Sequence, residues 1–167
     1  SNVSIKDLLM GLIVQSGNDA AVVLAEGISG DEEAFAREMN RYAKIMGMNN
    51  TYFTNSTGWP HPDLQTTSRD LIILTKKIVE DFPNLYKLFE RKIFTYNKIK
   101  QSNRNPLLYT MNGADGLKTG HTNESGYGLI GSVNRNNRRV TIVINGLNSK
   151  KKRTFESKRL FNIVFRE

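Results

Sequence analysis

Apolar residues recur at helical spacing through most of the first half of the chain. The first such run follows Ser4, a residue suited to an N-cap, with Asp7 three positions on. Its apolar positions are Leu8, Leu9, Leu12 and Ile13. Residues 16–18, Ser-Gly-Asn, interrupt the run, and an alanine-rich helix is predicted from Asp19 to about Glu26.

Further helices are predicted before residue 90. Asp31 suits the N-cap of a helix that Gly47 ends, and its apolar residues share one face. These residues are Phe35, Met39, Tyr42 and Met46. Residues 55–62 are rich in turn formers. Ser68 suits the N-cap of a helix that continues to about residue 80, and Pro83 suits the first position of a shorter one.

The hydrophobic period changes after about residue 92. Residues 93–99 alternate as an exposed strand or hairpin arm would, and residues 116–120 read as extended. The segments Tyr127–Val133 and Val140–Leu147 predict two strands joined by a polar turn. The segment Thr154–Phe165 predicts a closing helix.

This order predicts an α+β fold, because helices precede an antiparallel sheet and no strand–helix–strand alternation is present. Residues 1–90 are expected to be mainly helical. Residues 91–167 are expected to form the sheet and the terminal helix, within a single domain.

Composition narrows the function classes. The net charge of +8 is concentrated late in the chain, and without a nucleic-acid-binding motif it favours a solvated basic face over a nucleic-acid partner. The chain has no cysteine and only two histidines, far apart, so neither a metal nor a cofactor is expected. No apolar run is long enough to span a bilayer, so membrane attachment would depend on segments outside these residues.

Two short motifs carry candidate chemistry. Ser16-Gly17-Asn18 lies at a helix break, and Lys118-Thr119-Gly120 opens a run of strands. A serine hydroxyl and a lysine ammonium can relay a proton, and an asparagine amide can orient a substrate amide. A strand that begins Lys-Thr-Gly can pair with an extended peptide and present positive charge to its carboxylate.

Either motif alone is weak, since Ser16 and Asn18 could serve only as a cap and turn, and Thr119-Gly120 only as a strand entry. Together, and in this order, they match two of the three motifs S-x-x-K, S-D-N and K-T-G of penicillin-binding proteins and class A β-lactamases. The middle motif carries Gly17 where that set has aspartate.

The chain resembles the low-molecular-mass D-alanyl-D-alanine carboxypeptidases along nearly its whole length. Besides the two motifs, the stretches that carry the resemblance are 7–21, 49–58 (NNTYFTNSTG), 67–71 (TSRDL), 103–108 (NRNPLL), 115–127 (DGLKTGHTNESGY) and 153–157 (RTFES). The resemblance implies a partial DD-peptidase/β-lactamase-like fold. It also implies an arginine-containing turn before the last helix.

The resemblance implies catalytic roles for three residues. Ser16 would shuttle a proton, Asn18 would orient the substrate amide, and Lys118 would supply positive charge within a hydrogen-bond network. These side chains are therefore expected to converge on one cleft.

Substrate binding is implied for a second group. Lys118, Thr119 and Gly120 would line the strand edge beside the substrate, with His121 next to them. Arg153 would hold the terminal carboxylate of the substrate, and Arg104 would help to position it. The alternatives without a functional role are that Arg153 belongs to a solvated basic turn and that His121 takes no part in binding.

The chain departs from the family in one respect. The S-x-x-K motif, which should carry the nucleophilic serine upstream of Ser16, occurs only once, at Ser149-Lys150-Lys151-Lys152. Because this match follows the third motif, it is interpreted as a polar turn between strand and helix. The nucleophile helix, the family's first strands and the C-terminal domain with its anchor are expected to be missing.

The implied function is a serine-type D-Ala-D-Ala carboxypeptidase that acts through an acyl-enzyme, with this chain as an inactive fragment. Its implied partners are peptidoglycan pentapeptides and β-lactams, in the bacterial periplasm or at the outer face of the cytoplasmic membrane. The alternatives are a class A β-lactamase and a non-catalytic peptidoglycan-binding or β-lactam-sensing module. Against the first, no glutamate stands in an E-x-x-L-N context.

Overall fold

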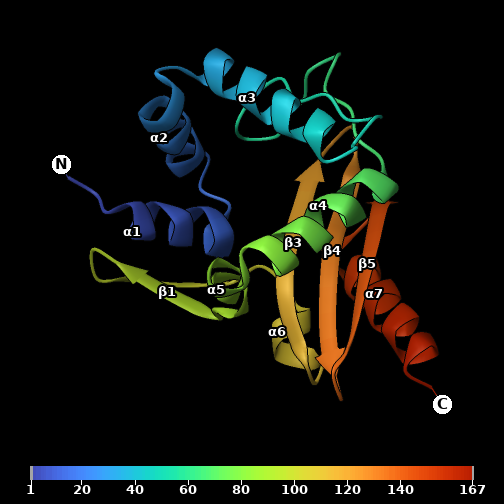
Figure 1. The fold of residues 1–167 in the computed structure, drawn as a ribbon. Helices are drawn as coiled ribbons and strands as arrows, with labels where there is room; N and C mark the ends of the chain where they lie inside the picture. Colours follow the sequence, from blue (N-terminus) through green and yellow to red (C-terminus); the bar gives the residue numbers. More distant parts are fainter. Residues whose placement is uncertain (1, 167) are drawn as a thin grey trace.

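The computed structural model describes residues 2–166 and confirms the α+β class. The first part is helical (Figure 1) and contains α1 (Ile5–Met10), a π-helical turn η1 (Gly11–Gln15), α2 (Asn18–Ser29), α3 (Glu32–Ile45), α4 (Ser68–Asp81), α5 (Pro83–Tyr86) and a short 3-10 turn η2 (Lys87–Glu90). The second part contains β1 (Ile93–Tyr96), β2 (Ile99–Ser102), α6 (Leu107–Thr110), β3 (Ala114–Thr122), β4 (Gly126–Arg135), β5 (Arg138–Leu147) and α7 (Lys150–Val164).

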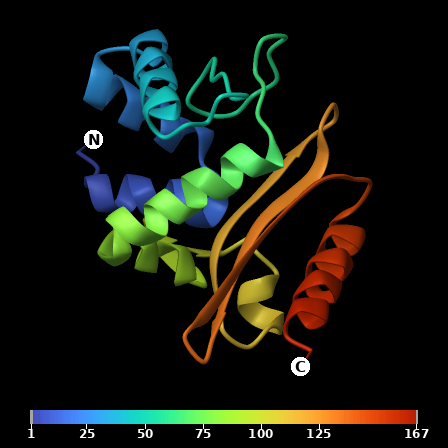
Figure 2. The ribbon, with the colours of Figure 1, turned by 45° about the vertical axis from the view of Figure 1, so that its right-hand side comes forward.

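The main sheet has three antiparallel strands in the order β3-β4-β5, and β1 and β2 form a separate hairpin. In the register of the first pair, Lys118 lies opposite Ile130 and His121 opposite Tyr127. Helix α7 covers one face of the sheet and α4 the other, as Figure 2 shows. The strands predicted at 127–133 and 140–147 are confirmed, each with a few more residues.

The hydrophobic core lies between the sheet, α6 and α7. Its fully buried side chains are Leu107, Leu129, Val133 and Phe161. Gly131 lets the layers approach closely, because a Cβ atom there would lie 2.7 Å from Leu107 Cδ1 and 3.1 Å from Phe161 Cε2. The closing helix predicted near the end of the chain therefore packs on the sheet, through the face that carries Ser157 and Phe161.

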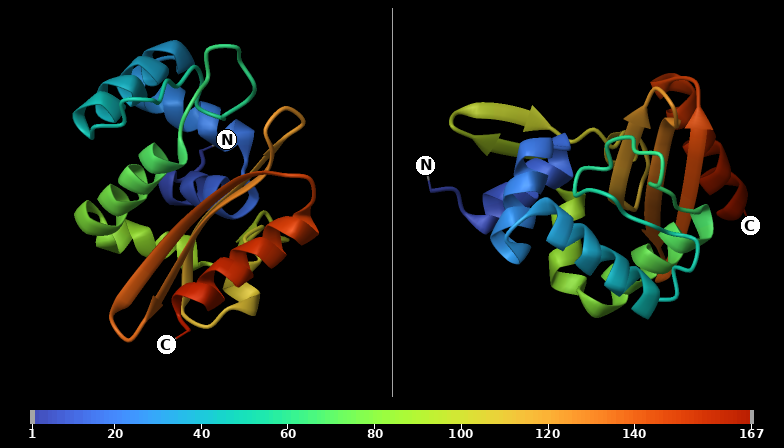
Figure 3. Two further views of the ribbon diagram at one scale, coloured as in Figure 1. Left: turned by 90° about the vertical axis from the view of Figure 1, so that its right-hand side faces the viewer. Right: turned by 90° about the horizontal axis from the view of Figure 1, so that it is seen from above.

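The helical part is held by buried polar contacts as well as by apolar packing. The Asp70 carboxylate, almost fully buried, accepts hydrogen bonds from the Asn50 backbone (2.8 Å) and the Thr51 hydroxyl (2.7 Å). Asn40 on α3 exchanges two bonds of 2.7 Å with the backbone of Phe53. These bonds fix the long segment between α3 and α4, which Figure 3 shows crossing beside α4.

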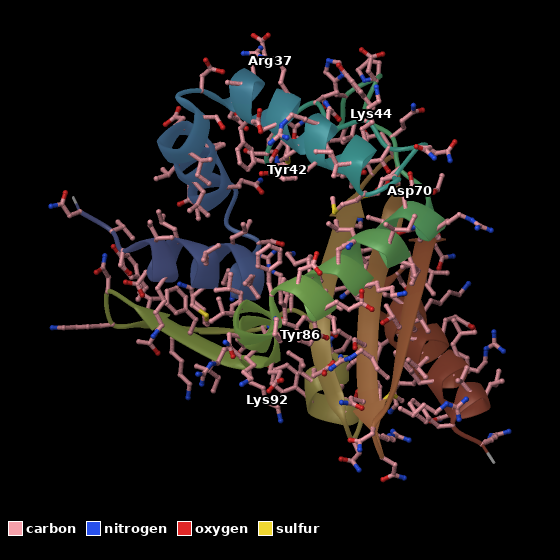
Figure 4. All side chains as sticks on the ribbon, in the orientation of Figure 1. Arg37, Tyr42, Lys44, Asp70, Tyr86 and Lys92 are labelled. Atoms are coloured by element: carbon pink, nitrogen blue, oxygen red, sulfur yellow. The ribbon has the colours of Figure 1, made fainter. Side chains whose placement is uncertain are left out.

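The predicted face of α3 is wrong at Tyr42. This side chain, labelled in Figure 4, is half-exposed. The Arg41 guanidinium lies over its ring. Ala36 and Ala43 are the buried residues of this helix. Small side chains allow closer approach than the larger apolar ones, so the packed face is offset from the one expected.

Three helix starts differ from the prediction. Helix α2 begins at Asn18 itself. The N-cap of α4 is Thr67, not Ser68, because Thr67 has extended backbone angles and its hydroxyl accepts from the Asp70 backbone at 3.2 Å. Helix α7 begins at Lys150 instead of Thr154, with Ser149 as its N-cap. The predicted N-caps Ser4 and Asp31 are confirmed.

The cap of α4 provides a test of the fold. We expect Thr67→Ala to lower the free energy of unfolding by about 1 kcal/mol, because the Asp70 amide loses its acceptor. Ser68→Ala, one residue later on an exposed position, should change it by only a few tenths of that value. Urea unfolding of both variants measures the difference, and equal losses would contradict the assignment.

Candidate active site

Ser16 lies at the end of the π-helical turn η1 in an unusual backbone conformation. Its angles, φ 58° and ψ 44°, are left-handed, a region that residues other than glycine rarely adopt. The Ser16 and Gly17 amides donate to the carbonyls of Leu12 (3.0 Å) and Gly11 (3.2 Å), which closes the turn. The helix break predicted at residues 16–18 is therefore a turn in which the backbone of Ser16 is strained. The two backbone hydrogen bonds hold this conformation in place.

This turn brings Ser16 to the start of β3. The Lys118 ammonium donates a hydrogen bond to the Ser16 hydroxyl across 102 positions of sequence, and a second to the Thr119 carbonyl at 2.9 Å. The two motifs therefore meet directly. Asn18 is exposed at the first position of α2, and no hydrogen bond within residues 2–166 joins its side chain to Ser16 or Lys118.

Lys118 is a weak base in this environment. Burial, together with the nearby positive charges of Arg104 and Arg153, lowers its pKa from 10.5 to about 8. Because the folded-state pKa is depressed, the buried ammonium opposes folding below about pH 8. That penalty is relieved as the pH rises toward the pKa of an unfolded lysine.

The strand edge beside Lys118 is open. Among the described strands, β3 pairs only with β4, so its other edge has free backbone groups. Side chains alternate across a strand, so Lys118 and Gly120 lie on the face toward Ser16, whereas Thr119 and His121 lie on the opposite face. That opposite face is the one α7 covers, since Leu129, opposite Thr119, packs with Phe161.

Arg153 lies on this face of the sheet, in α7. It lies in the first turn of α7, not in a turn before the helix as expected, and only 6% of its surface is exposed. Burial lowers the pKa of its guanidinium, and its Nε has no hydrogen-bond partner among the described residues. Its guanidinium carbon lies 5.8 Å from the centre of the Tyr127 ring.

Arg104 is held against the π-helical turn. Its backbone amide donates to the Val14 carbonyl at 3.3 Å, and its Nε donates to Gln15 Oε1 at 3.3 Å. Gln15 in turn donates to the Ser102 carbonyl at 3.0 Å. Arg104 therefore sits on the same side as Ser16, and Gln15 is a contact that sequence reasoning missed.

His121 is linked to Arg153 through the ring of Tyr127. The two residues are directly opposed across β3 and β4, and their rings lie 3.9 Å apart between centroids. Tyr127 was part of the stretch that carried the family resemblance, but it was assigned no role. Its pairing with His121 needed the strand register, which the sequence alone did not give.

The S-x-x-K match at residues 149–152 has a structural role. The Ser149 hydroxyl accepts from the Lys152 backbone at 3.1 Å as the N-cap of α7, so it does not face a lysine side chain as a nucleophile would.

Within residues 2–166, no group of three or more metal-binding side chains comes together. In the same residues, no helix is both long enough and apolar enough to cross a bilayer.

Comparison with known proteins identifies the family of the chain. The family described as D-alanyl-D-alanine carboxypeptidase matches residues 1–149. The chain is 46% identical to the D-alanyl-D-alanine carboxypeptidase DacA of Haemophilus influenzae, over 99% of this chain and 42% of the relative.

Solved structures share the fold. Penicillin binding protein 5 from Haemophilus influenzae superposes with a TM-score of 0.93 and 44% identity, over 97% of this chain and 48% of that one. Penicillin-binding protein D2 of Listeria monocytogenes, in its ampicillin-bound form, gives a TM-score of 0.90 and 32% identity, over 98% of this chain and 68% of that one. The chain spans less than half the length of the curated DacA relative. It belongs to the D-alanyl-D-alanine carboxypeptidase family.

Proposed function

We propose that this chain supplies the second and third motifs of a serine-type D-alanyl-D-alanine carboxypeptidase, which cleaves peptidoglycan stem peptides through an acyl-enzyme. The observation that carries the proposal is the contact between Ser16 and Lys118 beside an open strand edge. The relatives are bacterial enzymes named for this activity, so the cell envelope is the proposed location, in the periplasm or at the outer face of the cytoplasmic membrane.

The Ser16–Lys118 pair is suited to move a proton. A lysine with a pKa of about 8 exists in both protonation states near neutral pH, and a hydroxyl bonded to it can pass a proton onward. In this proposal Ser16 carries the proton between the nucleophile and the leaving amine. Asn18, exposed at the start of α2, remains free to hydrogen-bond the substrate amide.

The open edge of β3 is suited to hold the peptide. An extended substrate would pair with the free backbone groups of residues 118–121 as an added strand. Its terminal carboxylate would meet Arg153, whose buried Nε lacks a partner, and the field of Arg104 and Lys118. A buried cation without a counter-ion favours an anionic ligand, and the C-terminal D-alanine carries that anion.

The two alternative functions differ from the carboxypeptidase in the residues that they require or in whether the peptide is turned over. A class A β-lactamase would need a glutamate to activate the deacylating water, and the chain has no E-x-x-L-N segment. A binding or sensing module would hold the peptide or a β-lactam without turning over the peptide. Turnover by the longer protein that includes an S-x-x-K segment distinguishes the enzyme from the module.

The basicity of Lys118 can be tested through its neighbour. Arg104→Ala should raise the pKa of Lys118 above about 8, because a positive charge that disfavours the ammonium is removed. An NMR titration of the Lys118 side chain measures the pKa. Arg37→Ala, which removes an exposed arginine paired with Glu33, is the control and should leave it unchanged.

Carboxylate recognition by Arg153 gives a second prediction. In the longer enzyme, Arg153→Ala should weaken action on D-Ala-D-Ala peptides by about 1.5–3 kcal/mol, roughly 10-fold to 150-fold in kcat/KM. Reaction with a β-lactam ester, which lacks the free carboxylate, should change less. Steady-state kinetics with both compounds decide the question, and equal losses would refute the assignment.

The 167 residues themselves should not be labelled by a fluorescent penicillin. Covalent catalysis needs a nucleophile beside its base, and Ser16 is bonded to the lysine of the third motif, not to that of an S-x-x-K helix. Intact mass after incubation with penicillin is the measurement. An added penicilloyl group mapped to Ser16 would overturn the proposed roles, and labelling restored by adding the S-x-x-K segment would support them.

A further inference from the structure

Tyr127 contacts two of the residues proposed to bind substrate. Its ring lies 3.9 Å from the His121 ring, between centroids, and 5.8 Å from the Arg153 guanidinium carbon. The three residues come from β3, β4 and α7, so one aromatic ring joins three separate elements at the open edge of the sheet.

The backbone around Tyr127 is shaped to hold this ring in place. The pairing of β4 with β5 shifts register between Tyr127 and Leu129, and such bulges re-aim side chains. A Cβ atom on Gly126 would lie 2.8 Å from the Leu147 carbonyl oxygen, and one on Gly128 would lie 2.7 Å from Asn145 Oδ1. Glycine on both sides therefore allows β5 to press against the strand where the ring projects.

The Arg153 side chain has little else to fix it. Its backbone is anchored, since the amide donates to Ser149 at 3.0 Å and the carbonyl accepts from Ser157 at 2.6 Å. Its Nε, by contrast, has no partner in the described part of the chain. The negative face of an aromatic ring attracts a guanidinium, most strongly where water is excluded.

We propose that Tyr127 is a positioning residue. Its ring, which also packs against His121, orients Arg153 for the substrate carboxylate. This inference rests on the proposed function, because it takes the ligand of Arg153 to be that carboxylate. The ring does the positioning and the hydroxyl does not, since no hydrogen bond of the Tyr127 hydroxyl occurs within residues 2–166. Phenylalanine should therefore substitute for Tyr127, whereas leucine, which is apolar but has no π face, should not.

The test compares Tyr127→Phe and Tyr127→Leu in the 167-residue chain. The first readout is the Nε–H resonance of Arg153 without ligand. Its ring-current shift should persist with phenylalanine and disappear with leucine. The second is binding of N-acetyl-D-alanyl-D-alanine and of its C-terminal amide, followed by NMR titration. We expect leucine to weaken binding of the acid by about fivefold to tenfold and of the amide by less than twofold.

Two further variants separate positioning from general destabilisation. In an Arg153→Ala background, Tyr127→Leu should produce no additional loss, because the group that it orients is gone. Tyr42→Leu removes another ring beneath an arginine, Arg41, on α3, and should leave both readouts unchanged.

The outcomes separate the positioning role of Tyr127 from the carboxylate site of the proposed function. An unchanged Arg153 resonance in Tyr127→Leu, or equal weakening of acid and amide, would overturn the positioning role. Wild-type chain that binds acid and amide alike would refute the carboxylate site of the proposed function. The Arg153 resonance would still decide whether Tyr127 holds the guanidinium.

Discussion

The contact between Lys118 and Ser16 is the constraint on which the arrangement of the site depends. It joins the first helical turns of the chain to the sheet, which follows a hundred residues later. Both partners are costly to keep there, because Ser16 adopts a left-handed backbone and Lys118 is a buried cation whose pKa is lowered. Backbone strain and desolvation that coincide at one contact are typical of functional sites.

Two arginines, Arg139 and Arg153, differ in how far the protein compensates their charge. Arg139 is bonded to Asp115 at 2.6 Å, to Ser132 at 2.6 Å and to the Tyr86 hydroxyl at 3.0 Å, so its charge is compensated inside the protein. Arg153 has no comparable network, and its Nε is unpaired within the described residues. The same residue type is thus compensated inside the protein at one position and only partly hydrogen-bonded, among the described residues, at the other.

Local sequence signals were sufficient for most helices and strands, whereas the contact between the two motifs was expected from the family resemblance. Side-chain oxygens at Ser4 and Asp31 marked helix starts correctly, because capping is a local interaction. Where two hydroxyl residues are adjacent, as at Thr67 and Ser68, only the backbone angles decide which one caps. The contacts of Tyr127 and Gln15 depend on strand register and loop packing, which involve partners far away in sequence.

The glycine at the centre of the second motif also has a physical explanation. A Cβ atom on Gly17 would lie 3.0 Å from Asp19 Oδ1, which itself accepts a hydrogen bond of 2.9 Å from the Ala20 amide. A side chain at position 17 would therefore require the exposed Asp19 carboxylate to shift by a few tenths of an ångström. An aspartate at 17 would have to displace it and would bring two carboxylates together at the start of α2. The change from Ser-Asp-Asn to Ser-Gly-Asn thus leaves the turn that presents Ser16 intact, with the acidic side chain two residues further along the helix.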